Sequence, residues 1–113
     1  MRRHALLAFA LYYAATGALP LVSMRAFEAV TGPKIDRWLV KTVGMLVVAN
    51  AIAVAAGARR RVPSPETVAL ALCDALAFTT IDVTYVLRRR ISPIYLADAV
   101  VELALGAAIA LGD

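Results

Sequence analysis

The stretch that decides the fold is ISPIYLADAVVELALGAAIALGD, residues 91–113, a run of membrane-spanning length that carries Asp98 and Glu102 well inside it. A helix needs about 20 mostly apolar residues to cross a bilayer. Hydrophobic residues make up 62% of the 113-residue chain and charged residues only 18%, below the share of about a quarter that is usual in soluble domains. The composition therefore predicts an integral membrane protein, and the two carboxyl groups need an explanation within it.

Three further apolar runs share this character and lie between charged or proline-bearing breaks. The four predicted helices cover residues 5–24, 38–58, 66–87 and 93–111. Runs of this length, rich in Ala, Leu and Val and without alternation of period two, are typical of helices. We predict an all-α fold for residues 1–113: a single polytopic membrane domain, built as a bundle of four transmembrane helices with short loops, in a bacterial-type inner (plasma) membrane.

The first 20 residues also have the charged start, apolar middle and small-residue end of a secretory signal peptide. The apolar run continues through LPLVSM, beyond any cleavage site, so we expect residues 5–24 to be a retained span. Pro20 predicts a kink near the far end of this helix.

Two loops, RRRVPSPE and RRRISP, show a short similarity, since each places a Ser-Pro pair, at 64–65 and 92–93, before a helix. Serine suits the N-cap and proline the first helical position. Nine residues beyond each proline lie Asp74 and Glu102, about 13 to 14 Å along their helices. Because these helices run in opposite directions, the two carboxyl groups are predicted to lie at a similar depth near the bilayer centre. Chance explains the coincidence equally well.

The remaining charges in the apolar segments are predicted to approach each other from one membrane face. Lys41, Asp82 and Asp98 reach comparable depths along their helices, so we expect them to form a charged network. Tyr95 shares a helical face with Asp98, and Tyr85 shares one with Asp82, so both tyrosines are predicted to support the site. Additional hydroxyl groups within the bundle belong to Tyr12 and Tyr13, among others, while Gly44, Ala51 and Ala55 predict a close helix approach.

Four intramembrane carboxyl groups share one buried lysine in this arrangement, so at least two lack a basic partner. We therefore predict that Asp74 and Glu102 bind protons or a cation, which favours a transport or channel-like function. One alternative is an intramembrane enzyme that acts on a lipid-like substrate with these carboxyls as acid and base. Another is an accessory or scaffold subunit whose polar core only specifies packing. No catalytic motif assigns catalytic residues, and we lean against an enzyme.

Metal, cofactor and nucleic-acid sites have no support in the sequence. Cys73 is the only cysteine and His4 the only histidine, too few for a metal centre of the usual kind. No cofactor-binding motif is present, so no cofactor and no metal are expected. The net charge of +4 is spread over short loops without interleaved aromatic residues, which predicts contact with membrane lipids and not with nucleic acid.

The basic residues are divided almost evenly between the two predicted faces, five against six. Such a small bias permits insertion in both orientations, and so an antiparallel homodimer, although a single orientation fixed by the first helix is the alternative. In length and helix number the chain resembles the small multidrug resistance transporters. That family carries its essential glutamate in the first helix, whereas residues 5–24 contain no acidic residue, so the resemblance implies the architecture alone.

Overall fold

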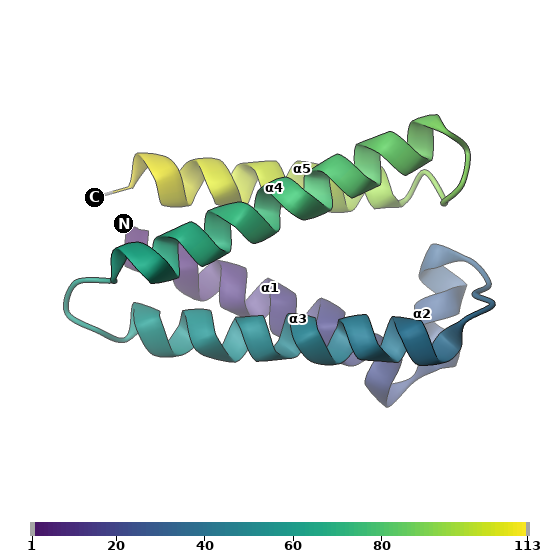
Figure 1. Ribbon diagram of the computed structural model, residues 1–113, viewed down its shortest axis with the longest axis horizontal. Helices are drawn as coiled ribbons and strands as arrows, with labels where there is room; N and C mark the ends of the chain where they lie inside the picture. The colour runs from purple at the N-terminus through teal and green to yellow at the C-terminus, as the bar shows by residue number, and fades with distance from the viewer. Residues whose placement is uncertain (1, 113) are drawn as a thin grey trace.

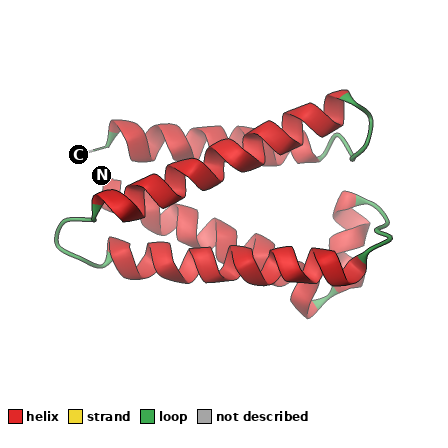
Figure 2. Ribbon diagram, viewed as in Figure 1, coloured by secondary structure: helices red, strands yellow, loops and turns green. Residues whose placement is uncertain are grey.

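A computed structural model describes residues 2–112 and shows five helices and no strand over that range (Figures 1 and 2). The all-helical prediction is confirmed. The helices α1, α3 and α4 are long and apolar enough to cross a membrane, while α5 has 17 residues. The helices are α1 (Arg2–Val22), α2 (Met24–Thr31), α3 (Arg37–Ala58), α4 (Pro65–Leu87) and α5 (Tyr95–Leu111).

The long helices are arranged as two pairs, in which α1 packs along α3 and α4 packs along α5. The first pair meets the second mainly through α1 and α5, with a smaller contact between α3 and α4. The start of α1 and the end of α5 lie at one end of the bundle, and α2 lies at the other (Figure 1). The core between the pairs contains Leu6, Phe9, Tyr13, Val54 and Ile109, all almost fully buried.

The helices α1 and α3 approach each other most closely where two glycines face one another. A methyl group built on Gly44 would lie 2.6 Å from the carbonyl oxygen of Gly17. The predicted close approach on residues 38–58 is therefore confirmed at Gly44. Ala51, on the same side of α3, is buried as well.

The two Ser-Pro pairs start their helices differently. Ser64 caps α4 as predicted, because its side chain accepts a hydrogen bond from the Thr67 amide and Pro65 is the first helical residue. The second pair lies outside its helix, since α5 begins two residues later, at Tyr95. The side chain of Ser92 instead accepts a 3.3 Å hydrogen bond from the Ile94 amide within the loop.

The helix α2 corrects the prediction that the first span continues to residue 24. The chain leaves the helical conformation at Ser23, whose extended backbone ends α1. The Ser23 side chain then accepts a 3.2 Å hydrogen bond from the Ala26 amide, which caps a new helix. The segment that follows the first span is therefore a short separate helix at the end of the bundle (Figure 1).

Candidate functional site

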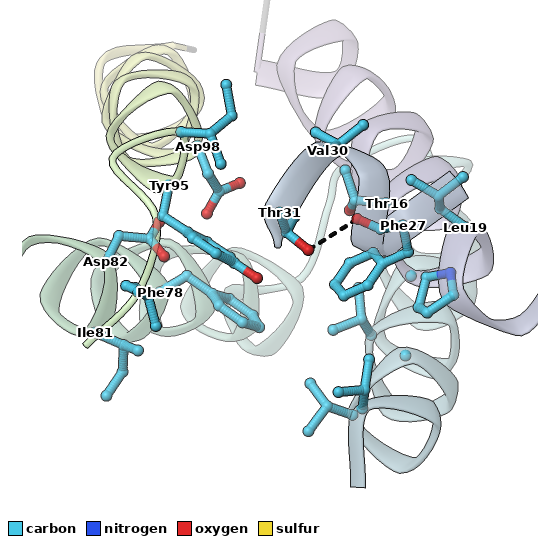
Figure 3. A pocket seen from close by; sticks show the side chains of 18 of the residues that line it. Thr16, Leu19, Phe27, Val30, Thr31, Phe78, Ile81, Asp82, Tyr95 and Asp98 are labelled. Atoms are coloured by element: carbon cyan, nitrogen blue, oxygen red, sulfur yellow. Dashed lines mark hydrogen bonds between the residues drawn. The ribbon is translucent and has the colours of Figure 1, made fainter. Parts of the chain in front are cut away.

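A cavity of about 650 Å³ lies between the two helix pairs, toward the end of the bundle that holds α2. Residues from all five helices line it, and most of the lining side chains are apolar. One wall differs, because α4 and α5 direct carboxyl groups toward it (Figure 3). The carboxyl groups that line the cavity are those of Asp82, Asp98 and Glu102, which we call the carboxyl cluster.

Two tyrosine hydroxyl groups from α1 reach the carboxyl cluster. Tyr13 is buried and donates a 2.7 Å hydrogen bond to Oε1 of Glu102. Its neighbour Tyr12 donates to Oδ1 of Asp98. The two hydroxyl groups that the sequence places within the bundle therefore both lie at the site itself.

The third carboxyl group, that of Asp82, lacks such a donor. Its side chain is only 3% exposed, and its Oδ2 atom has no hydrogen-bond partner among the described residues. The carboxyl groups of Asp82 and Asp98 are close enough to share a hydrogen bond when one of them holds a proton, and Asp82 also interacts electrostatically with Asp98 and Glu102. Figure 3 shows the carboxyl groups of Asp82 and Asp98 on the same side of the cavity. A buried acceptor without a donor is unfavourable, and neighbouring negative charges add repulsion in a medium of low dielectric constant.

Over residues 2–112 no basic side chain forms an ion pair with the cluster. The ion pair found there joins Arg37 to Glu28, with 2.9 Å between nitrogen and oxygen, and lies outside the cavity. Among the described residues, the carboxyl cluster therefore has no ion-pair partner, and Oδ2 of Asp82 has no hydrogen-bond donor.

The predicted pair of Asp74 and Glu102 is not joined directly in the structure. Asp74 accepts a 2.8 Å hydrogen bond from the side-chain amide of Asn50 on α3, and it does not line the cavity. Glu102 turns instead toward Tyr13 on α1. Asp74 and Glu102 therefore form two separate polar contacts in spite of their similar depth, because Asp74 faces α3 and Glu102 faces α1.

Lys41 does not join Asp82 and Asp98 as expected. Its side chain is exposed and does not line the cavity. The reason is that α1, which covers this face of α3, ends at Val22. Gly44 already packs against Pro20 in the last turns of α1, so Lys41, almost one turn beyond, has no helix to cover it.

The lysine that does approach the cavity is Lys34, in the turn before α3. It is half-buried, and its ammonium nitrogen lies 5.1 Å from the centre of the Tyr95 ring and 5.9 Å from that of Phe27. Of the two predicted supporting tyrosines, Tyr95 lines the cavity. Tyr85 instead lies with its ring 6.0 Å from the guanidinium carbon of Arg88 and is not part of the lining.

Glu28 holds the turn that carries Lys34. Its carboxylate accepts a 2.8 Å hydrogen bond from the Lys34 amide and forms the ion pair with Arg37. These contacts, the Lys34 amide above all, hold the pKa of Glu28 below its ordinary value of 4.5. The turn also needs Gly32, whose φ of +97° is unfavourable for other residues. Lys34 is therefore held in place at the edge of the cavity.

Comparisons of the chain with protein-family models, with curated proteins and with solved structures find no match. The arrangement can do two things: hold and release protons at the carboxyl cluster, and accommodate an apolar group beside it.

Proposed function

We propose that this chain is a small membrane transport protein whose carboxyl cluster exchanges protons with a cation in the cavity. The observation that carries the proposal is the buried Oδ2 atom of Asp82, which has no donor and lies beside Asp98 and Glu102. A proton shared within the cluster, or a cation that donates hydrogen bonds, supplies what the chain lacks. Intramembrane acidic residues of this kind commonly mark ion and proton pathways.

The proposal includes α5 as a fourth transmembrane helix. Its 17 residues extend about 25 Å, slightly less than the hydrocarbon thickness of about 30 Å. It packs along α4, and the three arginines at 88–90 suit the membrane surface between the two helices. We place the bundle in a bacterial-type inner membrane, and the near-even division of basic residues supports an antiparallel homodimer.

The scaffold alternative requires a filled polar seam in which Lys41 neutralises the carboxyl groups. The cavity and the exposed position of Lys41 argue against it. The enzyme alternative has one observation in its favour, since the apolar cavity beside Glu102 suits a lipid chain. It predicts a covalent change in lipids incubated with the protein, which mass spectrometry detects. Lipids that stay unchanged favour transport.

Infrared difference spectroscopy on the protein in lipid nanodiscs tests the proposal. We expect the spectrum at neutral pH to contain the C=O band of a protonated carboxyl group. Asp82→Asn and Glu102→Gln should each alter this band, whereas Glu66→Gln is the matched control, since Glu66 is exposed in the first turn of α4 and lies outside the cavity. The titratable groups around the carboxyl cluster are Tyr12 and Tyr13 on α1, Lys34 in the turn before α3, Asp74 on α4 and Tyr95 on α5.

A second measurement follows protons across the membrane. In liposomes that enclose a pH-sensitive dye, an outward gradient of the transported cation should drive proton entry with the wild type and the Glu66→Gln control, but not with Asp82→Asn. A protonated-carboxyl band that is the same in the wild type, Asp82→Asn and Glu102→Gln would refute the proposal, because the cluster would then hold no exchangeable proton.

A further inference from the structure

We infer that the cavity takes an amphipathic primary amine in its protonated form, with the ammonium group among Asp82, Asp98 and Glu102 and the apolar body along the opposite wall. The inference rests on the proposed function of the carboxyl cluster and names the class of cation that it binds. Three independent features of the cavity support it: the missing donor, the apolar walls and a primary ammonium group already present at the edge.

The missing donor determines the kind of cation. Asp98 and Glu102 each accept one hydrogen bond from a tyrosine, and Oδ2 of Asp82 accepts none. A carboxylate has lone pairs for about four hydrogen bonds, so the cluster has unused acceptors on all three side chains. A primary ammonium ion brings three N–H donors with its charge, whereas a quaternary ammonium ion brings charge alone. Over residues 2–112 no group of three or more His, Cys, Asp or Glu side chains is arranged to hold a metal ion.

The walls determine the rest of the ligand. Opposite the cluster, α3 contributes Val43 and Val47, and Phe78 of α4 closes the inner part of the cavity. Ile81 and Ile94, which also line it, are partly exposed on the outside of the bundle. In a membrane these side chains make the rim of the cavity continuous with hydrocarbon. The volume of about 650 Å³ far exceeds the space that an inorganic cation needs, and it fits a ligand with an apolar body.

Lys34 shows that the edge of the cavity accepts a primary ammonium group. Its nitrogen lies within 6 Å of the Tyr95 and Phe27 ring centres and donates a 3.3 Å hydrogen bond to the Thr31 carbonyl. Aromatic rings attract a cation at this range. An entering ammonium group would contact the same two rings and would be repelled by the positive charge of Lys34. Lys34 therefore competes with the ligand at the edge of the cavity.

Three probes with the same eight-carbon chain test the inference: octylamine, octyltrimethylammonium and octanol. Calorimetric titration of the wild-type protein in lipid nanodiscs, with empty nanodiscs subtracted, gives their affinities. We expect octylamine to bind at least about tenfold more tightly than either other probe, because hydrogen bonds to charged groups are each worth a factor of about ten or more. Asp82→Asn should abolish the preference, Asp74→Asn should retain it, and Lys34→Met should strengthen the binding of octylamine.

The comparison of probes on the wild type decides the question without any variant. Equal binding of octylamine and octyltrimethylammonium, or tighter binding of the quaternary ion, overturns the inference. If this happens while the carboxyl band still depends on Asp82, the ligand class is wrong and the proposed proton exchange stands. If the band depends on neither Asp82 nor Glu102, both proposals fall together.

Discussion

Replacing Gly44 by alanine tests whether the close crossing of α1 and α3 holds the bundle and its cavity together. The added methyl group would lie 2.6 Å from the carbonyl oxygen of Gly17, whereas ordinary contact begins at 3.4 Å. The two helices must therefore move apart by about 0.8 Å, since the obstacle is backbone and no side chain can rotate away. Gly17 and Gly44 both line the cavity, so the displacement also changes its width.

Overpacking of this kind costs about 1 to 3 kcal/mol, and the better helix propensity of alanine returns up to about 1 kcal/mol. We expect Gly44→Ala to lower the free energy of unfolding by up to about 2 kcal/mol, and to be about 1 to 3 kcal/mol less stable than a variant that gains the same propensity without the clash. The matched control is Gly106→Ala on α5, because a methyl group there meets only the Ala75 Cβ at 3.5 Å. That variant should be as stable as the wild type or slightly more stable.

Reversible unfolding in mixed detergent micelles, followed by circular dichroism, measures both variants. The difference between Gly44→Ala and Gly106→Ala is the informative quantity, because both substitutions add the same methyl group to a helix. Equal stability of the two variants would refute the packing argument, and with it the conclusion that the glycine contact sets the separation of α1 and α3.

Two further predictions concern the tyrosine and the turn beside the cavity. Tyr13→Phe keeps the ring packed on Phe9 but removes the donor to Glu102, so the free energy of unfolding should fall by about 0.6 to 2 kcal/mol, while exposed Tyr85→Phe changes nothing. Glu28→Gln should speed hydrogen exchange of the Lys34 amide at neutral pH. The pKa of Glu28 is lowered from 4.5 in the folded protein. Its stabilising contribution is therefore complete above pH 4.5 and is lost as the pH falls through the lowered pKa. In the wild type, only strong acid should loosen the turn in the way that Glu28→Gln does at neutral pH.

The long helices were predictable because the length of an apolar run carries the information. The prediction of residues 38–58 and 66–87 differs from α3 and α4 by one residue at the start. The helix α2 was not predictable in the same way. Its eight residues include Arg25 and Glu28, so they form no apolar run. Its beginning depends on a hydrogen bond to the Ser23 side chain, and a serine within an apolar run does not by itself predict such a cap.

The candidate site shows where a single sequence stops being informative. Residue counts place Asp74, Asp82, Asp98 and Glu102 at depths along their own helices, because each residue adds about 1.5 Å. They do not determine how the helices are rotated and paired. That rotation directs Asp74 toward Asn50, away from Glu102, and brings Asp82 to Asp98. The exposure of Lys41 likewise follows from where α1 ends and not from its own position in α3.

The energetics of the carboxyl cluster favour a function over a role in packing. Hydrogen bonds between transmembrane helices contribute about 0.6 kcal/mol on average and rarely more than about 2 kcal/mol. An ionised aspartate costs about 2.5 to 3.5 kcal/mol at the centre of such a helix, even on the mild insertion scale, and less toward the helix end, where Asp82 lies. The hydrogen bond from Tyr13 to Glu102 is enough to connect α1 to α5 without Asp82. Asp82 adds no hydrogen bond through its buried Oδ2 atom, so its contribution to stability is negative unless a proton or a bound cation completes the site.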